Sequence, residues 1–353
     1  MVAPLNWGLG HATRCMPIIN YLLQQGIEVI IGSDGNALSL LQKEYPQLTH
    51  IELPSYNITY KTSNMFMNIA PQVPKILNAI RLERKLLETI ISQYKIDAII
   101  SDNRYGLQHS SLPSVFMTHQ LNIIVPNKLV SNWVRKMNQR YIQQFTACWV
   151  PDYPNEPSLA GELSHGNWKN ITYVGPLSRL SHQHQAAQND ILVVLSGPEP
   201  QRSILEQKII AQAKTIDRQF VIVSGQTKTY EVEQLEPNIK RYSYMTSQNL
   251  NASILNSKVI IARSGYSTLM DLVQLQCQQV IFIPTPGQTE QEFLAKRFYE
   301  KKQFYYQNQK DLNLTLALKE LKKFSGLSPY TTENSSTLED TIDNFLTQLA
   351  TNS

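Results

Sequence analysis

The chain alternates short, apolar, β-branched runs with longer segments of helical spacing. In the first half these runs cover residues 2–5, 27–31, 96–100, 114–117 and 148–150. The pattern restarts in the second half, with runs at 191–195, 220–223, 258–262 and 279–283. Because parallel strands are buried on both faces and joined by crossover helices, this pattern predicts an α/β fold with two Rossmann-like domains.

A polar stretch rich in His and Gln separates the two halves and ends near Asn189. With 353 residues the chain is long enough for two α/β domains, each with its own core. We expect an N-terminal domain at 1–176, a C-terminal domain at 177–330 and a tail helix within 331–353. The two domains are expected to face each other across a cleft.

Composition argues against several classes of protein. The net charge is +4, from 32 Lys and Arg against 28 Asp and Glu, which is too small to indicate a nucleic-acid binder. The three cysteines lack CxxC or Cys/His spacing, so we expect neither disulfides nor a metal site. No leader peptide and no run of eighteen apolar residues occurs, and a cytoplasmic protein is therefore expected.

The first candidate site is the turn between the first strand and a helix that starts at His11. Gly8 and Gly10 allow a ligand to approach the backbone closely, and the helix start offers N–H groups that favour negative charge. The same glycines begin the GxGxxG spacing of dinucleotide oxidoreductases, with Asp34 placed for a ribose. Thr13 replaces the third glycine, which weakens that alternative.

In the second half, three polar turns follow apolar strands and open helices. One contains Arg263, Ser264, Gly265 and Thr268, with Asp271 one to two turns into the helix, where it suits ribose hydroxyls. Small hydroxyl residues and glycine at a helix start favour an anion. Each turn alone is also explained by an ordinary capped loop. Three at the carboxyl ends of one sheet indicate a ligand site.

The other two turns add polar groups at the same edge. Ser196, Gly197 and Arg202 follow the first strand of this half and add amides and a guanidinium for the same anionic ligand. Gln288, Gln291 and Glu292 follow a later strand, and their amides and acids suit sugar hydroxyls.

Together, the glycine-histidine turn, the Arg263–Asp271 segment and the Gln288–Glu292 turn resemble the B-type (GT-B) glycosyltransferases of family 28. The similarity covers nearly the whole chain and is most specific in the second half, with the MurG-like N-acetylglucosaminyltransferases and diacylglycerol sugar transferases as the nearest relatives. Such enzymes invert the sugar, use a nucleotide sugar, usually a UDP-sugar, and need no bound metal or other cofactor. The resemblance implies a cell-envelope glycan or a lipid-linked or small molecule as the acceptor.

The resemblance also implies roles for single residues. Ser264, Gly265 and Thr268 would hold the diphosphate, and Asp271 the ribose, where the family often has Glu. The remaining implied contacts are Met245 near the uracil, Gln291 and Glu292 at the donor sugar, and His11 at the reacting centre.

One segment departs from the peptidoglycan enzymes. Residues 119–122 read His-Gln-Leu-Asn where those enzymes carry His-Glu-Gln-Asn, so we do not expect the peptidoglycan lipid intermediate as acceptor. His119 and Asn122, with Gly8 and Gly10, are the expected acceptor-binding residues.

Inverting transfer needs a base for the acceptor hydroxyl. His11 has a suitable intrinsic pKa and is the favoured candidate, with Asp102 at the end of a strand as its rival. Asp102 could also only cap a helix, and His11 could only hold its loop. No Asp-x-Asp metal pair is present, so the helix start at Gly265 and arginines would stabilise the leaving diphosphate.

An apolar segment at residues 65–70 precedes a basic helix with Lys75, Arg81, Arg84 and Lys85. A partly buried helix with a solvated face explains this pattern. The alternative is a patch that docks on the inner face of an anionic membrane or on a lipid-linked substrate. For the whole chain, two other functions stay open: a sugar-nucleotide 2-epimerase and a non-catalytic nucleotide-sugar-binding protein.

Overall fold

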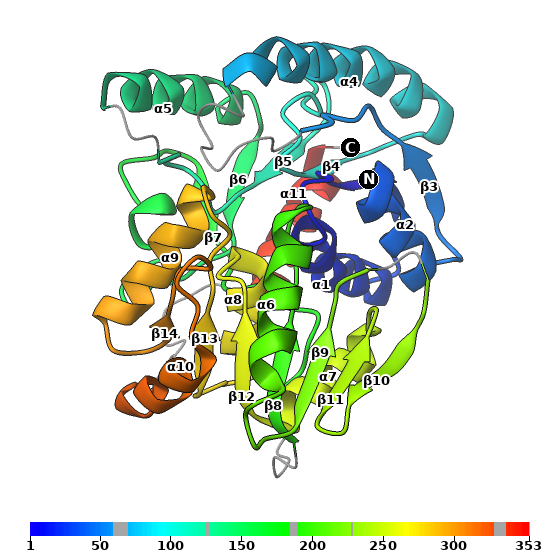
Figure 1. Ribbon diagram of the computed structural model, residues 1–353. Coiled ribbons are helices and arrows are strands. Elements are labelled where there is room, and N and C mark those ends of the chain that lie inside the picture. Colours follow the sequence, from blue (N-terminus) through cyan, green and yellow to red (C-terminus); the bar gives the residue numbers. More distant parts are fainter. Residues whose placement is uncertain (59–69, 125–127, 184–188, 227–228, 328–336, 353) are drawn as a thin grey trace. The chain divides into compact units, whose positions relative to one another are not determined.

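The computed structural model describes residues 1–58, 70–124, 128–183, 189–226, 229–327 and 337–352, which form two compact units (Figure 1). Unit 1 contains the described residues up to Leu177 together with 337–352, and unit 2 contains those from Ser178 to 327. Each unit has one sheet of seven described strands with helices packed against it. The expected α/β fold class is confirmed.

The sheet of unit 1 is parallel throughout, in the order β3-β2-β1-β4-β5-β6-β7. Its strands are β1 (Val2–Pro4), β2 (Ile30–Ser33), β3 (Thr49–Glu52), β4 (Ile99–Asp102), β5 (Ser114–Met117), β6 (Ala147–Val150) and β7 (Ile171–Tyr173). Its helices are α1 (Gly10–Gln24), α2 (Gly35–Glu44), α4 (Val73–Tyr94), α5 (Lys128–Ile142) and α11 (Leu338–Asn352), with short 3₁₀ turns η1 (Ala70–Gln72) and η2 (Gly161–Leu163).

Helix α4 covers one face of this sheet. Its Leu87 and Ile90 pack in one buried cluster with Ala3, Ile30 and Ile99 of three neighbouring strands. The last helix, α11, packs beside α1 (Figure 1). The end of the described chain therefore completes the unit that the first strand begins.

Unit 2 has the strand order β10-β11-β9-β8-β12-β13-β14, parallel except for the β10–β11 pair. Its strands are β8 (Asn189–Val194), β9 (Phe220–Val223), β10 (Val232–Glu236), β11 (Ile239–Tyr242), β12 (Ser257–Ala262), β13 (Val280–Phe282) and β14 (Tyr305–Tyr306). Its helices are α6 (Gln201–Ala213), α7 (Ser247–Leu255), α8 (Tyr266–Gln274), α9 (Thr289–Glu300) and α10 (Leu314–Glu320), followed by η3 (Leu321–Lys323).

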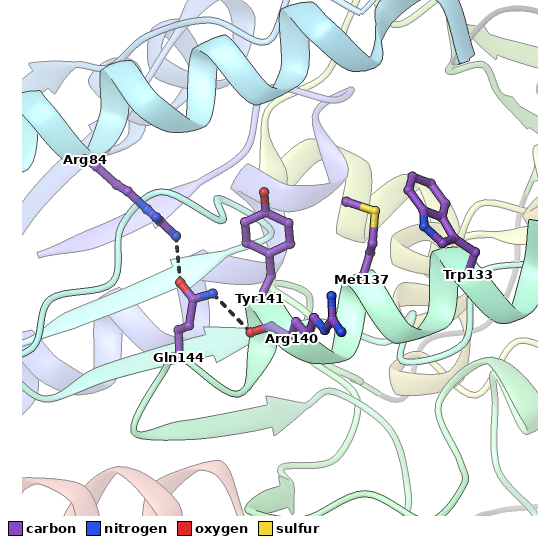
Figure 2. A pocket seen from close by; sticks show the side chains of 6 residues that line it. All are labelled: Arg84, Trp133, Met137, Arg140, Tyr141 and Gln144. Atoms are coloured by element: carbon purple, nitrogen blue, oxygen red, sulfur yellow. Dashed lines mark hydrogen bonds between the residues drawn. The ribbon is translucent and has the colours of Figure 1, made fainter.

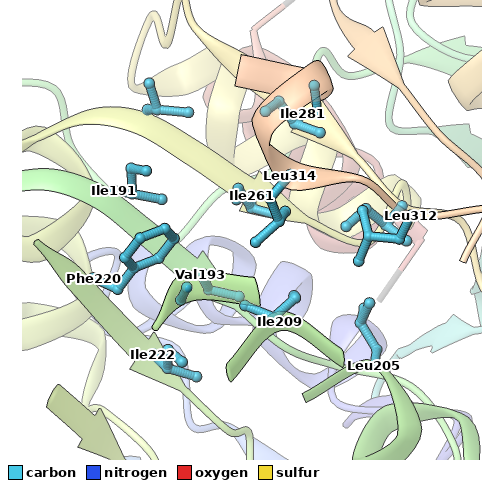
Figure 3. Close-up of a cluster of buried hydrophobic side chains, with 14 of the residues drawn as sticks. Ile191, Val193, Leu205, Ile209, Phe220, Ile222, Ile261, Ile281, Leu312 and Leu314 are labelled. Atoms are coloured by element: carbon cyan, nitrogen blue, oxygen red, sulfur yellow. The ribbon is translucent and has the colours of Figure 1, made fainter. Parts of the chain in front are cut away.

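The core of unit 2 lies between its sheet and helices α6 and α10 (Figure 3). Alternate strand residues such as Ile191 and Val193 point to the same face and pack against Leu205 and Ile209 of α6. Burying these side chains stabilises each by roughly 1.5–3 kcal/mol. A firm core therefore holds the strand ends and the turns that follow them.

Two strands start later than their apolar runs suggest. The N–H of Ile27 donates to Leu22 O at 3.0 Å, and the N–H of Ile96 donates to Ile91 O at 3.4 Å. Each residue thus closes the end of the preceding helix instead of joining the sheet. Strand β4 ends at Asp102, which pairs in register with Pro4 of β1.

None of the helices in the described ranges combines the length and the apolar composition that crossing a bilayer requires.

Candidate functional site

The strand order places the ends of certain strands at a crossover point in each sheet. In unit 1 the strands are added outward from β1 on one side and outward from β4 on the other, so the crossover point lies between β1 and β4. In unit 2 it lies between β8 and β12. Ligands of parallel α/β sheets bind at such points, outside the carboxyl ends of the strands. His11 follows β1 and Asp102 ends β4, so the sequence-predicted pair meets at this point.

His11 and Asp102 are hydrogen-bonded. The distance from His11 Nδ1 to Asp102 Oδ1 is 3.0 Å. Because a carboxylate only accepts, Nδ1 of His11 carries the donated proton, and Nε2 is an acceptor whenever the ring is neutral. The His11 side chain is 14% exposed and Asp102 is fully buried. Only the histidine can therefore reach a substrate.

Arg14 completes this cluster from the same helix. Its Nε donates to Asp102 Oδ2 at 2.7 Å and its Nη2 donates to Oδ1. Burial alone would raise the pKa of Asp102, but the charge of Arg14 and the hydrogen bonds from Arg14 and His11 hold it well below its usual range. Asp102 is therefore a permanent carboxylate.

The loop after β5 joins the cluster through His119. Nη1 of Arg14 lies 3.0 Å from His119 Nδ1, and His119 is almost fully buried. Asn122, the other predicted acceptor residue of this loop, donates from Nδ2 to Glu162 O at 2.7 Å and to His165 O at 2.6 Å. In this structure Asn122 shapes the loop, and its contact with an acceptor stays a prediction.

A second buried charge network anchors the glycine turn. Arg104, fully buried, pairs with Asp34 and with Glu83 of α4, and its Nε donates to Pro4 O at 3.0 Å. Asn6 donates to Asp34 Oδ2 at 3.1 Å. Asp34 is thus occupied by protein groups and not placed for a ribose.

Gly8 and Gly10 of that turn differ in their demands. Gly8 has φ +78 and is exposed, a conformation that favours glycine. Gly10 is the first residue of α1, one position before His11. The turn therefore places an exposed glycine three residues before His11.

In unit 2 the three predicted turns follow β8, β12 and β13, which are adjacent strands. Gly197 has φ +98, and a Cβ there would lie 3.3 Å from Thr285 Oγ1 of the third turn. Gly265 is the N-cap residue of α8, and no side chain forms a capping hydrogen bond there. The exposed Ser196 and Gly197 and the helix start thus lie at one edge of one sheet.

Arg263 joins these turns. Its Nη1 donates to Ile283 O at 3.0 Å and to Pro284 O at 3.1 Å, and its Nη2 donates to Gln201 O at 2.9 Å. Burial lowers its pKa to about 10, so it stays charged at neutral pH. These bonds support the turns, and a direct contact of Arg263 with phosphate stays a prediction.

Arg202 is also engaged within the protein. It pairs with Glu199, lies 3.5 Å from Glu206 and donates to Ser224 O at 2.8 Å. The charge of Arg202 is thus shared with two carboxylates, and its contact with a diphosphate stays a prediction. Backbone amides at the helix starts add further positive potential at this edge.

The third turn is ordered by Gln291. Its Oε1 accepts from Thr285 N at 2.8 Å, its Nε2 donates to Gln288 Oε1 at 2.5 Å, and its backbone O accepts from the buried Ser264 hydroxyl at 2.7 Å. Glu292 is exposed and accepts from Gly287 N at 3.0 Å. Gln291 and Ser264 thus tie two helix starts together, while Gln288 and Glu292 are more accessible.

Asp271, Thr268 and Met245 occupy the sides of this edge. Burial raises the pKa of Asp271 to about 6, although Ser178 Oγ donates to it at 2.5 Å and Arg179 is near. Thr268 is half-buried on the first turn of α8. Met245 follows β11 at the same edge and accepts a contact from Ser253 Oγ at 3.3 Å.

A groove lies between α4 and the end of α5 in unit 1 (Figure 2). It has a volume of about 400 Å³ and is lined by Arg84, Trp133, Met137, Arg140, Tyr141 and Gln144. Arg84 donates to Gln144 Oε1 at 2.6 Å, while its Nε is buried without a partner among the described residues. Trp133 is 58% exposed.

The groove is connected to the His11 cluster through the loop after β5. Asn138 of α5 donates to Gln120 O at 3.0 Å and to Leu121 O at 3.1 Å, directly after His119. Tyr141 packs on the same apolar cluster as Trp7 of the glycine turn. Helix α5 therefore fixes both the groove and the loop that carries His119.

Comparisons with known proteins agree with this geometry. The chain is 21% identical over 304 residues to an uncharacterized glycosyltransferase of Methanosarcina mazei, covering 81% of this chain and 79% of that protein. A second such protein, from Methanosarcina acetivorans, is 22% identical over 315 residues, with the same coverage. Residues 191–345 match the family model of the glycosyltransferase family 28 C-terminal domain. This chain is a glycosyltransferase of the GT-B fold, and its residues 191–345 resemble the family 28 C-terminal domain.

Solved structures show the same fold for this glycosyltransferase. MurG of Acinetobacter baumannii aligns with a TM-score of 0.57 at 14% identity, covering 99% of this chain and 98% of MurG. The glycosyltransferase VinC, solved in complex with DTDP, aligns with a TM-score of 0.59 at 13% identity, covering 100% of this chain and 99% of VinC. The dinucleotide oxidoreductase alternative is not supported.

Sequence reasoning missed two features of the glycosyltransferase. Arg14 was not assigned to the site. It lies four residues before the inward-facing Ile18 and therefore on the same face of the helix, and a charged residue on an inward face indicates a buried partner. The groove on α5 was also missed, because the helix was not recognised. Residues 65–69 of the expected docking segment lie outside the described residues. Within the described ranges, no group of three or more His, Cys, Asp and Glu could hold a metal.

Proposed function

We propose that this glycosyltransferase transfers a hexose or N-acetylhexosamine from a UDP-sugar to an acceptor hydroxyl with inversion at the anomeric carbon. The observation that carries the proposal is the His11–Asp102 hydrogen bond at the crossover point of unit 1. It leaves one ring nitrogen as a base, oriented by a buried carboxylate. His11 is therefore preferred to Asp102 as the base.

In the proposed reaction, His11 Nε2 accepts the proton of the acceptor hydroxyl as its oxygen attacks the anomeric carbon. The bond from that carbon to the diphosphate oxygen breaks, and the nucleoside diphosphate leaves with the electron pair. Unit 1 is proposed to hold the acceptor, and unit 2 is proposed to hold the sugar donor. His119 and the turn at Gly8 and Gly10 are proposed to place the acceptor.

Backbone amides at the start of α8 are proposed to meet the charge of the leaving diphosphate, without a metal. Gly265 has no side chain, and the cap is open on its ligand side because a Cβ there would find its nearest neighbour, Gln291 Nε2, at 3.9 Å. The Thr268 hydroxyl would add a hydrogen bond to the phosphates, with Ser264 and Arg263 shaping the turn. Such preorganised donors typically supply the largest part of catalysis.

The other donor contacts follow from the accessible groups. Asp271 is proposed to accept from the ribose, Met245 to lie against the base, and Gln288 and Glu292 to bind the sugar hydroxyls. VinC and the glycosyltransferase SpnG have both been solved with a thymidine diphosphate, which supports a pyrimidine nucleoside diphosphate as the leaving group here.

The donor half of this proposal is tested by thermal melting with UDP-, TDP- and GDP-sugars. A donor at one hundred times its Kd stabilises the fold by about 2.7 kcal/mol. Gly265 has φ −71 and ψ 145, a conformation that alanine also adopts, so Gly265→Ala should fold normally. The added methyl group should weaken donor binding by about tenfold. Unchanged affinity in Gly265→Ala would contradict a diphosphate at this cap.

The transfer half is tested by product analysis with lipid and small-molecule acceptors. Inverted product together with released nucleoside diphosphate is the expected result. Conversion of a nucleotide sugar without an acceptor would indicate the 2-epimerase alternative, which the comparisons do not favour. Binding without turnover over a broad acceptor panel would instead favour a binding protein.

The groove of unit 1 is proposed to contact an anionic membrane or the lipid part of an acceptor. It combines an exposed tryptophan with two arginines, and Lys75, Arg81 and Lys85 of α4 are exposed nearby in sequence. Apolar insertion and basic residues act together at such surfaces. Trp133→Ser should reduce co-sedimentation with anionic vesicles, whereas Leu316→Ser, at an exposed apolar residue of unit 2, should not.

A further inference from the structure

Arg14 is buried at a position that serves His11. It lies three residues after His11 on α1, so both side chains share one face of the helix. It is 1% exposed, and its guanidinium grips both oxygens of the carboxylate that also accepts from His11. An arginine in this fixed fork geometry cannot move without moving Asp102.

The same guanidinium sets the state of His119. Because a guanidinium only donates, His119 accepts at Nδ1, and the neutral ring then carries its proton on Nε2. The four side chains His11, Asp102, Arg14 and His119 therefore form one continuous hydrogen-bonded chain. Each group in the chain has its donor and acceptor roles fixed by its neighbour.

Asp102 and Arg14 carry opposite charges in this series of hydrogen-bonded side chains. A buried carboxylate without a counter-charge would favour the protonated imidazolium of His11, and a base that already holds a proton accepts none. Arg14 supplies the counter-charge. Cys15 also faces the carboxylate, with Sγ 3.7 Å from Asp102 Oδ2, but burial raises the pKa of its thiol well above the usual value, so it stays neutral.

We propose that Arg14 is a positioning residue for sugar transfer, which holds Asp102 so that it orients His11 and which balances the negative charge of Asp102 beside that ring. This inference rests on the proposed function of His11 as the base. The groups that face this carboxylate in unit 1 are His11, Arg14 and Cys15 of α1, and His119 is reached through Arg14.

The test is a titration of the histidine rings by nitrogen NMR, which needs neither donor nor acceptor. The His11 signals are assigned by their loss in His11→Gln. In Arg14→Met the carboxylate loses its counter-charge, so the midpoint of the His11 titration should rise by about one pH unit or more. The acid side of the pH–rate profile for transfer should move upward by the same amount.

Two variants separate this electrostatic role from a merely structural one. Arg14→Lys keeps the charge but not the fork, so the midpoint should stay near that of the wild type while turnover falls. Arg14→Met combined with Asp102→Asn removes both charges, and its midpoint should return to the wild-type value or below. The double variant also serves if Arg14→Met does not fold, because it leaves no unpaired buried charge.

An unchanged midpoint in Arg14→Met, or in the double variant a midpoint raised above that of the wild type, would overturn the inference whatever the activity shows. A shifted midpoint together with normal transfer by His11→Gln would instead overturn the assignment of His11 as the base. The two failures are thus distinguishable.

Discussion

The carboxyl edges of the two sheets are formed by different kinds of groups. In unit 1 the edge is made of buried charged side chains, with Arg14 on Asp102 and Arg104 on Asp34 and Glu83. In unit 2 the edge is made of glycine turns and helix starts, and its buried Arg263 donates to backbone carbonyls. The first arrangement suits the placing of one proton acceptor, and the second suits a cradle for a diphosphate.

Two aspartates show the same contrast. The guanidinium of Arg14 holds the pKa of Asp102 well below its usual range despite its burial. Burial raises the pKa of Asp271 to about 6, because the Ser178 hydroxyl and the nearby charge of Arg179 do not offset it. A buried carboxylate keeps its charge firmly only where a cation is packed against it. Unit 1 thus carries a fixed charge, and Asp271 of unit 2 carries one that depends on pH.

The largest effect is expected from a substitution at the carboxyl edge of the sheet in unit 1. His11→Gln removes the proton acceptor, so kcat for transfer should fall by about 10²–10⁴-fold. Donor affinity, measured by calorimetry, should not change, since the donor contacts are proposed in unit 2. His109→Gln, which removes a histidine that lies outside the proposed site and is paired with Glu88, is the matched control. Near-normal kcat in His11→Gln would contradict the proposed base.

A smaller effect is expected from a substitution at the carboxyl edge of the sheet in unit 2. Arg263→Met leaves three carbonyl oxygens without their donor and should lower the free energy of unfolding by about 2–4 kcal/mol, as urea titration would measure. Donor binding should weaken with it, because the three turns lose their common tie. Arg218→Met, an exposed arginine of the same unit, should change neither quantity by more than about 0.5 kcal/mol.

The smallest effect concerns the pH dependence of stability. Since the pKa of Asp271 is raised in the fold, the folded state binds the proton more tightly than the unfolded chain does. The resulting stability is present below about pH 4 and is lost as pH rises through about 6. Asp271→Asn should therefore stabilise the protein by about 1 kcal/mol at pH 7 and much less at pH 4.

Melting curves across pH check this expectation, with the exposed Asp217→Asn as control. Equal effects of Asp271→Asn at both pH values would show that its carboxyl is not desolvated.

Most of the fold follows from the pattern of the chain. The apolar runs at 114–117 and 220–223 became strands with those bounds, and the helix expected from His11 became α1, with Gly26 at φ +73 just beyond its end. Weak edge strands such as β10, with an exposed and polar pattern, were missed because little apolar surface is buried there. Periodicity detects burial, and edge strands bury little.

By itself, the sequence determined which strand ends carry polar residues, since a strand must bury its apolar run and leave the turn outside. It therefore brought His11, Asp102 and the three turns of unit 2 to the proper edges. Only the tertiary structure decided which partner each side chain takes. Arg14 and Asp102 are 88 residues apart in the chain, and a bond of 2.7 Å between them depends on register and packing that no local pattern encodes.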